Sequence, residues 1–413
     1  METLICRAEE ELNVGFDRFR EECSRAIQEL RSGGYEKALV VHHNDADGLC
    51  SGALVKAALE REGVKPRLTC LEKVYPEVIS SIHSTWSGVV FYCDIGSSHA
   101  GMISEYNRGR CLTIILDHHD PEEARDERVV DLNLERFGYV GETDFSGATC
   151  CYLFCRELNP ENRSLSYLAL TGSCEIPGEY RGLNLQVLGE ALKFGVVEER
   201  GRDYVITRLG VTVKRLFSML QVLGSTLYYS GGPSLGVRMC LEGPFEEAVK
   251  AVGEAEERRK KANKRLLAIL YRKGFTKVTE HIQYLDSGNV FEGFGTKAVG
   301  TFASMISYRG RPVDPNKYIF VSMRVPREVP GWGSLEREFT KFSVRAPKKL
   351  RELISVGKMP SVVDLLRRAS EPIGGVADGH SVAGSVIVPA GLEGEFIERC
   401  EEAVKEFLSG GWK

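Results

Sequence analysis

The segment KALVVHHNDADG, residues 37–48, decides how the rest of the chain is interpreted. It begins with an apolar run of the length expected for a buried β-strand. His42, His43, Asp45 and Asp47 then follow at short spacing, before a glycine. Aspartate favours turns and the first positions of helices, so this segment alone predicts a strand followed by a capped helix.

Strand-like and helical segments alternate along the first part of the chain. Strand-like runs cover 37–43, 67–71, 88–94 and 111–117, and helical stretches cover 52–62 and 75–86. This alternation predicts an α/β fold in which helices cover both faces of a parallel sheet. Apolar residues at helical spacing predict further helices at 8–32, 146–158 and 164–173.

The rest of the chain predicts a long helix and then a smaller α/β domain. Residues 245–273 hold many helix formers and no proline, which suits a connector between two domains. Strands are expected at 236–241, 317–324 and 384–389, and helices at 360–369 and 392–408. The predicted domains are an N-terminal helix (1–34), an α/β domain (35–243), a helical connector (244–275) and a C-terminal domain (276–413).

Composition excludes several classes of protein. The chain has 413 residues, 43% hydrophobic and 27% charged, as in an ordinary globular protein. Its net charge of −4 argues against a non-specific basic nucleic-acid binder, though not against a local basic groove.

No apolar run approaches the ~20 residues that span a bilayer, so a cytoplasmic protein without membrane contact is expected. The twelve cysteines include no CxxC pair, so we expect buried thiols rather than zinc sites or disulfides.

Acidic and histidine side chains follow three of the strand-like runs. Asp45 and Asp47 follow the first, Asp94 follows the third, and Asp117-His118-His119 follow the fourth. The carboxyl ends of parallel strands meet at one edge of a sheet, so these groups should converge. Carboxylates with imidazole suit Mn²⁺ or Mg²⁺, and a pair of such ions ~3.5–4 Å apart can activate water against a phosphate ester.

A further histidine, His380, lies in the glycine-containing stretch ADGHSVAG, residues 377–384. Glycines let the backbone approach an anion closely, and backbone amide and imidazole groups would donate hydrogen bonds there. A plain loop before a strand explains the stretch equally well. Arg345 is a second candidate for the same cleft, because its guanidinium can bind phosphate through two hydrogen bonds.

The ordered motifs HNDADG, FYCDIGSS, LDHHD and DGHSVAG resemble the DHH phosphoesterase superfamily with its DHH-associated C-terminal domain. The likeness is greatest to archaeal RecJ-like exonucleases, including the GINS-associated nuclease; it covers residues 35–185 well and 295–408 more loosely. The resemblance implies two Mn²⁺ or Mg²⁺ ions held by Asp45, Asp47, Asp94 and His118. It implies that His119 faces the scissile phosphate, with Asp117 behind it, and that His43, Arg345, Gly379 and His380 bind substrate.

Two positions depart from the family pattern. Where the family carries a fourth metal-binding aspartate, this sequence has Ile176, which cannot bind metal. Glu175, the nearest acid, is the candidate to replace it as a ligand, although it comes one position earlier and, on a helix, would be turned by roughly 100°. The second ion is therefore expected to be held less well. The family's glycine run before the C-terminal histidine reads Ala-Asp-Gly-His here, and Asp378 adds a negative charge that should weaken phosphate binding.

Two functions fit these observations. The first is a metal-dependent phosphodiesterase that hydrolyses single-stranded DNA, RNA or oligonucleotides. The second is a catalytically weakened RecJ-like scaffold in the replication helicase complex, bound to factors such as GINS. The retained metal motifs favour the first function, and the change at Ile176 favours the second.

Overall fold

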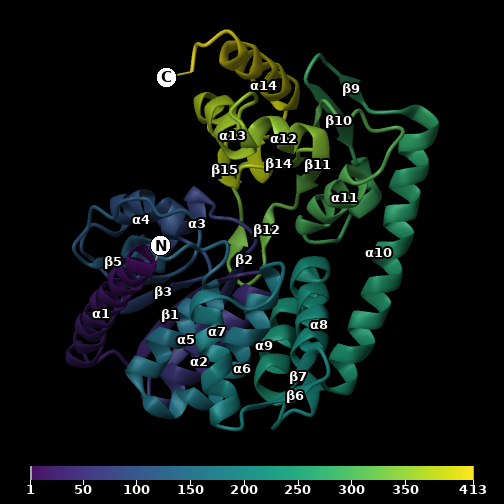
Figure 1. Ribbon diagram of the computed structural model, residues 1–413. Coiled ribbons are helices and arrows are strands. Elements are labelled where there is room, and N and C mark those ends of the chain that lie inside the picture. The colour runs from purple at the N-terminus through teal and green to yellow at the C-terminus, as the bar shows by residue number, and fades with distance from the viewer. Residues whose placement is uncertain (1, 413) are drawn as a thin grey trace. The chain divides into compact units, whose positions relative to one another are not determined.

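The computed structural model describes residues 2–412 and the side chains of residues 14–412. The chain divides into two compact units. One extends to Val252 and includes Pro330–Trp332; the other comprises Gly253–Val329 and continues from Gly333. Each unit combines helices with a central sheet, as Figure 1 shows. The α/β class expected from the sequence is confirmed.

A five-stranded sheet forms the centre of the N-terminal unit. Its strands are β1 (Lys37–His43), β2 (Lys65–Leu71), β3 (Val89–Cys93), β4 (Leu112–Leu116) and β5 (Val129–Asp131). They lie in the order β2-β1-β3-β4-β5, and all neighbours are parallel. Every residue of β3 and β4 is buried, because helices cover both faces.

The helices of this unit form two layers around the sheet. On one side α1 (Glu2–Ser32), α2 (Ala46–Arg61) and α5 (Gly147–Leu158) pack together; on the other, α3 (Pro76–Thr85) packs with α4 (Ala100–Asn107) (Figure 1). The chain moves from β1 to β2 in one direction and then crosses back to β3, so right-handed connections place α2 and α3 on opposite faces. The carboxyl ends of β1 and β3 therefore flank the topological switch point, where α/β sheets bind ligands.

Helix α2 begins at Ala46, earlier than the expected residue 52. Asp45 is its N-cap, since Asp45 Oδ1 accepts a hydrogen bond from the Gly48 amide at 2.9 Å. The capping role that the isolated segment predicts is thus real. Asp47 consequently lies in the first turn of the helix rather than in a loop.

The remainder of the unit is mostly helical. Its elements are α6 (Ser166–Gly172), α7 (Gly182–Lys193), β6 (Val197–Arg200), β7 (Asp203–Ile206), β8 (Val211–Thr212), α8 (Val213–Thr226) and α9 (Gly232–Glu242), and the three strands form a small antiparallel sheet. The strand predicted at 236–241 is wrong, because this stretch belongs to α9. Pro233 occupies the start of that helix, and its buried residues recur at helical spacing through Cys240.

Helix α10 (Glu246–Lys273) is continuous, as residues 245–273 predict. The C-terminal unit contains a six-stranded mixed sheet in the order β15-β16-β14-β11-β10-β9. Its strands are β9 (Lys277–Val278), β10 (Ile282–Asp286), β11 (Tyr318–Val325), β14 (Phe339–Arg345), β15 (Val376–Gly379) and β16 (Ala383–Pro389), and a separate hairpin pairs β12 (Glu328–Val329) with β13 (Gly333–Ser334). Only β10 and β11 run parallel in the six-stranded sheet.

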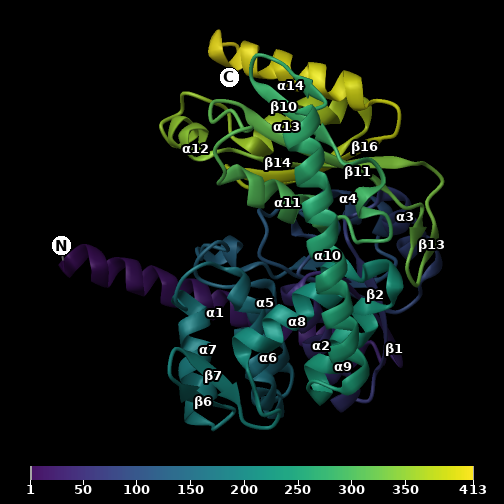
Figure 2. The same ribbon diagram turned by 90° about the vertical axis from the view of Figure 1, so that its right-hand side faces the viewer.

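Two apolar cores lie on opposite faces of this sheet. Phe320 and Phe342 face the core formed with α12 (Lys348–Ser355), α13 (Val362–Ser370) and α14 (Glu393–Leu408). Ile319 and Val321 face the core formed with α10 and α11 (Lys297–Ser307), because successive strand residues point to opposite faces. Figure 2 shows α13 and α14 on one side of the sheet and α11 on the other.

Two further findings concern the cysteines and the helices of the described residues. The described cysteine side chains are all free thiols, and among them only Cys174 is not fully buried. Among the helices of residues 2–412, none combines the length and the apolar character needed to cross a bilayer.

Candidate metal centre

The acids and histidines at the strand ends meet at the switch point of the N-terminal sheet. Asp45 and Asp47 follow β1, Asp94 follows β3, and His118 and His119 follow β4. The potential ligand atoms of His43, Asp45 and Asp94 lie within 4.8 Å of one another, and so do those of Asp94, His118 and His119. The expected convergence is therefore observed, and Asp94 belongs to both groups.

Asp94 occupies the centre of the site. Its Oδ2 lies 3.5 Å from His43 Nδ1, and its Oδ1 lies 3.4 Å from His118 Nε2. The residue is 1% exposed, and neither carboxylate oxygen accepts a hydrogen bond within the described part of the chain. Its φ of 59° is a left-handed conformation that a side chain other than glycine seldom adopts. A buried carboxylate held in this way fits a ligand that bridges two cations.

Asp47 is fixed by the first turn of helix α5. Its Oδ1 accepts hydrogen bonds from Ser146 Oγ at 3.0 Å and the Ala148 amide at 2.9 Å, and its Oδ2 accepts one from the Gly147 amide at 2.9 Å. Oδ2 also lies 3.9 Å from His118 Nε2. The helix N-terminus stabilises the carboxylate and fixes its direction toward the centre.

The two histidines of the Asp117-His118-His119 triplet are oriented by different partners. His118 Nδ1 lies 3.0 Å from the Gly141 carbonyl oxygen, so Nδ1 carries the proton and the Nε2 lone pair faces Asp47 and Asp94. His119 Nδ1 lies 2.7 Å from Asp117 Oδ1, which places Nε2 on the opposite side of the ring. His118 therefore has the tautomer of a metal ligand.

The electrostatics of the site favour a bound cation. Burial, followed by the charges of Asp47 and Asp45, raises the pKa of Asp94 well above its usual value. Burial also opposes ionisation of Asp117, but the adjacent His119 and its hydrogen bond hold the pKa of Asp117 below its usual range. A divalent cation would offset the repulsion among the buried carboxylates, and the imidazole and carboxylate donors present fit Mn²⁺ or Mg²⁺.

Further polar residues hold Asp117 and His119 in place through hydrogen bonds. The Ser97 amide donates to Asp117 Oδ2 at 2.9 Å, and the Ser97 hydroxyl donates to Asp131 Oδ1 at 2.7 Å. The Asn133 backbone amide also donates to Asp131 Oδ1, at 3.2 Å, and the Asn133 side-chain Nδ2 donates to the His119 carbonyl oxygen at 2.7 Å. Asp131 thus accepts hydrogen bonds from both Ser97, which contacts Asp117, and Asn133, which contacts His119.

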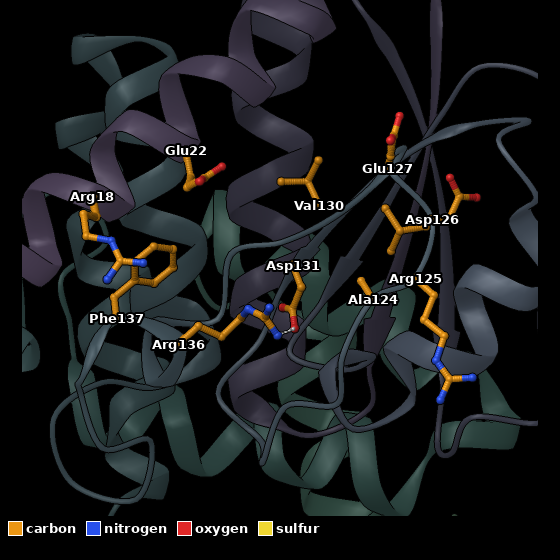
Figure 3. Close-up of a pocket in the computed structure, with 11 residues that line it drawn as sticks. Arg18, Glu22, Ala124, Arg125, Asp126, Glu127, Val130, Asp131, Arg136 and Phe137 are labelled. Carbon is orange, nitrogen blue, oxygen red and sulfur yellow. Dashed lines mark ion pairs between the residues drawn. The ribbon is translucent and has the colours of Figure 1, made fainter.

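Sequence reasoning did not single out Asp131 or Asn133, although Asp131 is another acid at the carboxyl end of a strand. Asp131 is buried, and burial raises its pKa to about 6. Its Oδ2 lies 3.9 Å from Arg136 Nη1, and both side chains line a cavity of about 680 Å³ beside α1 (Figure 3). The carboxylate is therefore reached from the side of the sheet's last strand, away from the metal ligands.

Glu175 and Ile176 do not lie on an α-helix, in agreement with the helix predicted at 164–173. Helix α6 ends at Gly172, residues Ser173–Glu175 form one 3₁₀ turn, and Ile176 is extended. The Pro177 that follows disfavours a helical conformation at Ile176. Glu175 is exposed, and its charge contributes to the raised pKa of Asp94 after burial and the three aspartates. Its role as a ligand remains a prediction.

The predicted substrate-binding residues of the C-terminal unit gather at one end of its sheet. Arg345 pairs with Ala383, and Gly379 pairs with Gly384 in the hairpin that joins β15 to β16. Gly379 has a φ of 135°, and a Cβ there would lie 2.4 Å from the Gly384 Cα. The His380 amide donates to the Ala383 carbonyl oxygen at 2.8 Å, so this amide closes the hairpin and is not available to an anion.

Comparisons with known proteins agree with this fold. The model of the DHH family N-terminal domain matches residues 37–172. An uncharacterized protein of Methanocaldococcus jannaschii is 31% identical over 189 residues, which are 43% of this chain and 42% of that protein. The matched region thus spans less than half of the relative.

Solved structures extend the likeness to nearly the whole chain. A structure of the exonuclease RecJ bound to manganese is 18% identical, covers 94% of each chain and superposes with a TM-score of 0.62. CDC45 from Entamoeba histolytica is 9% identical, covers 94% of this chain and 98% of its own, and gives a TM-score of 0.53. The N-terminal unit thus resembles the DHH family N-terminal domain over residues 37–172. More particularly, its fold is that of RecJ-like DHH proteins.

Proposed function

We propose that the protein is a metal-dependent phosphodiesterase of the RecJ type that hydrolyses single-stranded nucleic acid or oligonucleotides. The observation that carries this proposal is the position of Asp94 between two groups of ligand atoms, with two buried oxygens that accept no hydrogen bond within the described residues. The family match over residues 37–172 and the RecJ-like fold support the same class of reaction.

The residues at the strand ends would hold two Mn²⁺ or Mg²⁺ ions. Asp45, Asp47 and His118 would contribute one ligand each, and Asp94 would be shared. Such ions would activate water and neutralise charge on the phosphate during hydrolysis. His119, positioned by the buried and ionised Asp117, would direct its imidazole toward the scissile phosphate.

Arg345 is the best supported of the proposed substrate-binding residues. Its guanidinium donates to Ser304 Oγ at 2.8 Å and to the Val344 carbonyl oxygen at 2.8 Å, and it forms no ion pair with a described carboxylate. Burial lowers its pKa to about 10, so it is still a cation at neutral pH. A mostly buried guanidinium whose partners are all neutral is suited to a phosphate. Gly379 and His380 of the same unit are proposed to act with it, and His43 is proposed to bind substrate at the metal centre.

Cleavage of labelled single strands tests this proposal. Wild-type protein with Mn²⁺ should shorten 5′-labelled DNA or RNA or cleave dinucleotides, and the double variant Asp117→Ala/His118→Ala should not. Chelation of the metal should stop the wild-type reaction. If the wild-type protein and the double variant gave equal background on all of these substrates, the proposed activity would be wrong.

A RecJ-like scaffold is the second candidate. Two features favour it: Ile176 stands in place of an acid, and the His380 amide is used within its own hairpin. The likeness to CDC45 supports it too, because the fold is not confined to RecJ. A scaffold would bind replication factors such as GINS whether or not metal is present. Stable, metal-independent capture of such factors by a protein that lacks cleavage activity would favour this function over hydrolysis.

A further inference from the structure

A cavity of about 940 Å³ lies in the N-terminal unit next to the 3₁₀ turn that follows α6. Segments from the loop after that turn, α7, the β6–β7 hairpin and the start of α8 surround it. Its volume is in the range of sites that hold small organic molecules, about 300–1,000 Å³. The metal ligands do not line this cavity, so it is a separate feature of the unit.

Aromatic side chains form part of the cavity wall. The ring centroids of Tyr180 and Tyr204 are 6.2 Å apart, and Phe217 joins them from α8. Tyr180 donates its hydroxyl proton to the Leu170 carbonyl oxygen at 2.9 Å, which fixes the position of its ring. Flat aromatic faces of this kind bind nucleobases by stacking, with little dependence on the sequence of the strand.

A hydrogen-bond donor lies at the base of the cavity. Asn184 lines the cavity although it is 2% exposed. Its Oδ1 accepts hydrogen bonds from Thr149 Oγ1 at 2.6 Å and Ser173 Oγ at 2.9 Å. Within the described residues, both of these side-chain hydrogen bonds involve Oδ1, so the Nδ2 of Asn184 can donate to a ligand in the cavity. Nucleobases carry ring nitrogens and carbonyl oxygens that accept such hydrogen bonds.

The base of the cavity is connected to the metal centre. Ser173 Oγ lies 3.3 Å from Ser146 Oγ, and Ser146 Oγ donates to Asp47 Oδ1 at 3.0 Å. Two hydroxyl groups therefore separate the Asn184 amide from a predicted metal ligand. Ile176, which stands where the family has an acid, also lines the cavity.

We propose that this cavity binds a nucleobase of the nucleic-acid substrate, by stacking on Tyr180 and Tyr204 and by a hydrogen bond from Asn184. This proposal rests on the proposed phosphodiesterase function, because it assumes that a nucleotide phosphate occupies the metal centre. Two cations, Lys214 and Arg202, and two anions, Glu179 and Glu199, line the cavity, so their charges offset one another. Stacking and the hydrogen bond, rather than charge, would therefore select a nucleotide with a base over a sugar phosphate without one.

Binding of AMP and ribose 5-phosphate to the full-length protein tests the base pocket. Isothermal titration with Mn²⁺ present should show that AMP binds at least about ten-fold more tightly than ribose 5-phosphate. Tyr204→Ala should remove most of this preference and leave the affinity for ribose 5-phosphate unchanged. Asn184→Asp, which keeps the acceptor for Thr149 and Ser173 but replaces the donor, should do the same. Tyr271→Ala, at an exposed position of α10, is the matched control and should keep the preference.

Equal binding of AMP and ribose 5-phosphate to the wild-type protein would overturn the base pocket, and so would a preference that survives Tyr204→Ala. Circular dichroism shows whether each variant is folded; Tyr204 is on a partly exposed strand, so its variant decides the question if Asn184→Asp is unfolded. The cleavage assay separates the two proposals. If Tyr204→Ala removes the base preference but the wild-type protein cleaves no substrate, the base pocket is supported and the phosphodiesterase function is not. If the wild-type protein cleaves substrate but Tyr204→Ala keeps the base preference, the phosphodiesterase function is supported and the base pocket is not.

Discussion

Gly147 lies directly against Asp94: a Cβ built on Gly147 would be 2.4 Å from Asp94 Oδ1. The Gly147 amide also donates to Asp47 Oδ2 at 2.9 Å. One residue without a side chain therefore lets the first turn of α5 approach both carboxylates. A larger residue would move either the helix or Asp94, because this part of the unit is fully buried.

Gly147→Ala should therefore weaken metal binding by at least about ten-fold, the usual effect of disturbing the support of a metal ligand. Titration calorimetry with Mn²⁺ measures this change. Gly189→Ala is the control, since nothing lies within 4 Å of a Cβ at that position in α7 and alanine favours helices. Equal Mn²⁺ affinity in the two variants would show that Asp94 does not need the space beside Gly147.

Asp94→Asn should stabilise the metal-free protein and abolish its response to metal. Burial and repulsion from Asp47 and Asp45 disfavour the charged carboxylate, so a neutral amide should raise the free energy of unfolding in EDTA by roughly 1–3 kcal/mol. Thermal melting would show a rise of a few degrees in EDTA. Mn²⁺ should raise the melting temperature of the wild-type protein but not of the variant. A variant that melts lower in EDTA yet still responds to Mn²⁺ would contradict this account.

Asp131 should act as a positioning residue for Asp117 and His119. Asp131→Ala removes the acceptor for Ser97 and Asn133 and should lower kcat about ten-fold or more, with a smaller effect on KM. Asp131→Asn keeps an acceptor oxygen and should restore most of the activity. Steady-state kinetics on a dinucleotide measures both variants. If the two substitutions lowered kcat equally, the charge of Asp131 rather than its hydrogen bonds would be what matters.

His83 should make the stability of the protein depend on pH. It is fully buried between Asn107 and Tyr92, with its ring nitrogens 3.0 Å from Asn107 Oδ1 and Tyr92 Oη. Burial lowers the pKa of His83 to about 4, below its ordinary value of about 6.5. The unfolded chain therefore binds the proton first as the pH falls. The contribution of His83 is complete above about pH 6.5 and is lost toward about pH 4.

Urea unfolding at pH 7.5 and pH 5 measures this effect. The stability difference between the wild-type protein and His83→Gln, which does not titrate, should shrink on acidification. The change should be at most about 3 kcal/mol over the full pH range, and less at pH 5. A constant difference would mean that His83 binds a proton equally well in the folded and unfolded chains.

The sequence predicted the N-terminal sheet apart from β5 because the signals of the other strands are local. Short apolar runs such as 37–43 and 111–117 have the length and the β-branched content of strands buried on both faces, and the acids after them mark one edge of the sheet. The short runs of the C-terminal sheet, such as β10, alternate with loops and carry weaker signals. Residues 236–241 read as a strand because a six-residue apolar run has no resolvable period, and only the packing of α9 decides the matter.

The candidate site was predictable as a set of ligand types but not as a network. Strand-end acids identify Asp45, Asp94 and their neighbours, whereas the support from Asn133 depends on how distant loops fold back. The change at Ile176 could be read from the sequence, but its place in the wall of a cavity could not. Side chains that act through hydrogen bonds to others have no fixed spacing along the chain.

The central claim is that the carboxyl ends of β1, β3 and β4 hold a pair of divalent cations around Asp94. Anomalous scattering from crystals soaked in Mn²⁺ tests it most directly. We predict two manganese peaks ~4 Å apart or less, both in contact with the Asp94 carboxylate, and none at Asp94 in the Asp94→Asn variant. The absence of manganese beside Asp94 in wild-type crystals at millimolar Mn²⁺ would contradict the claim.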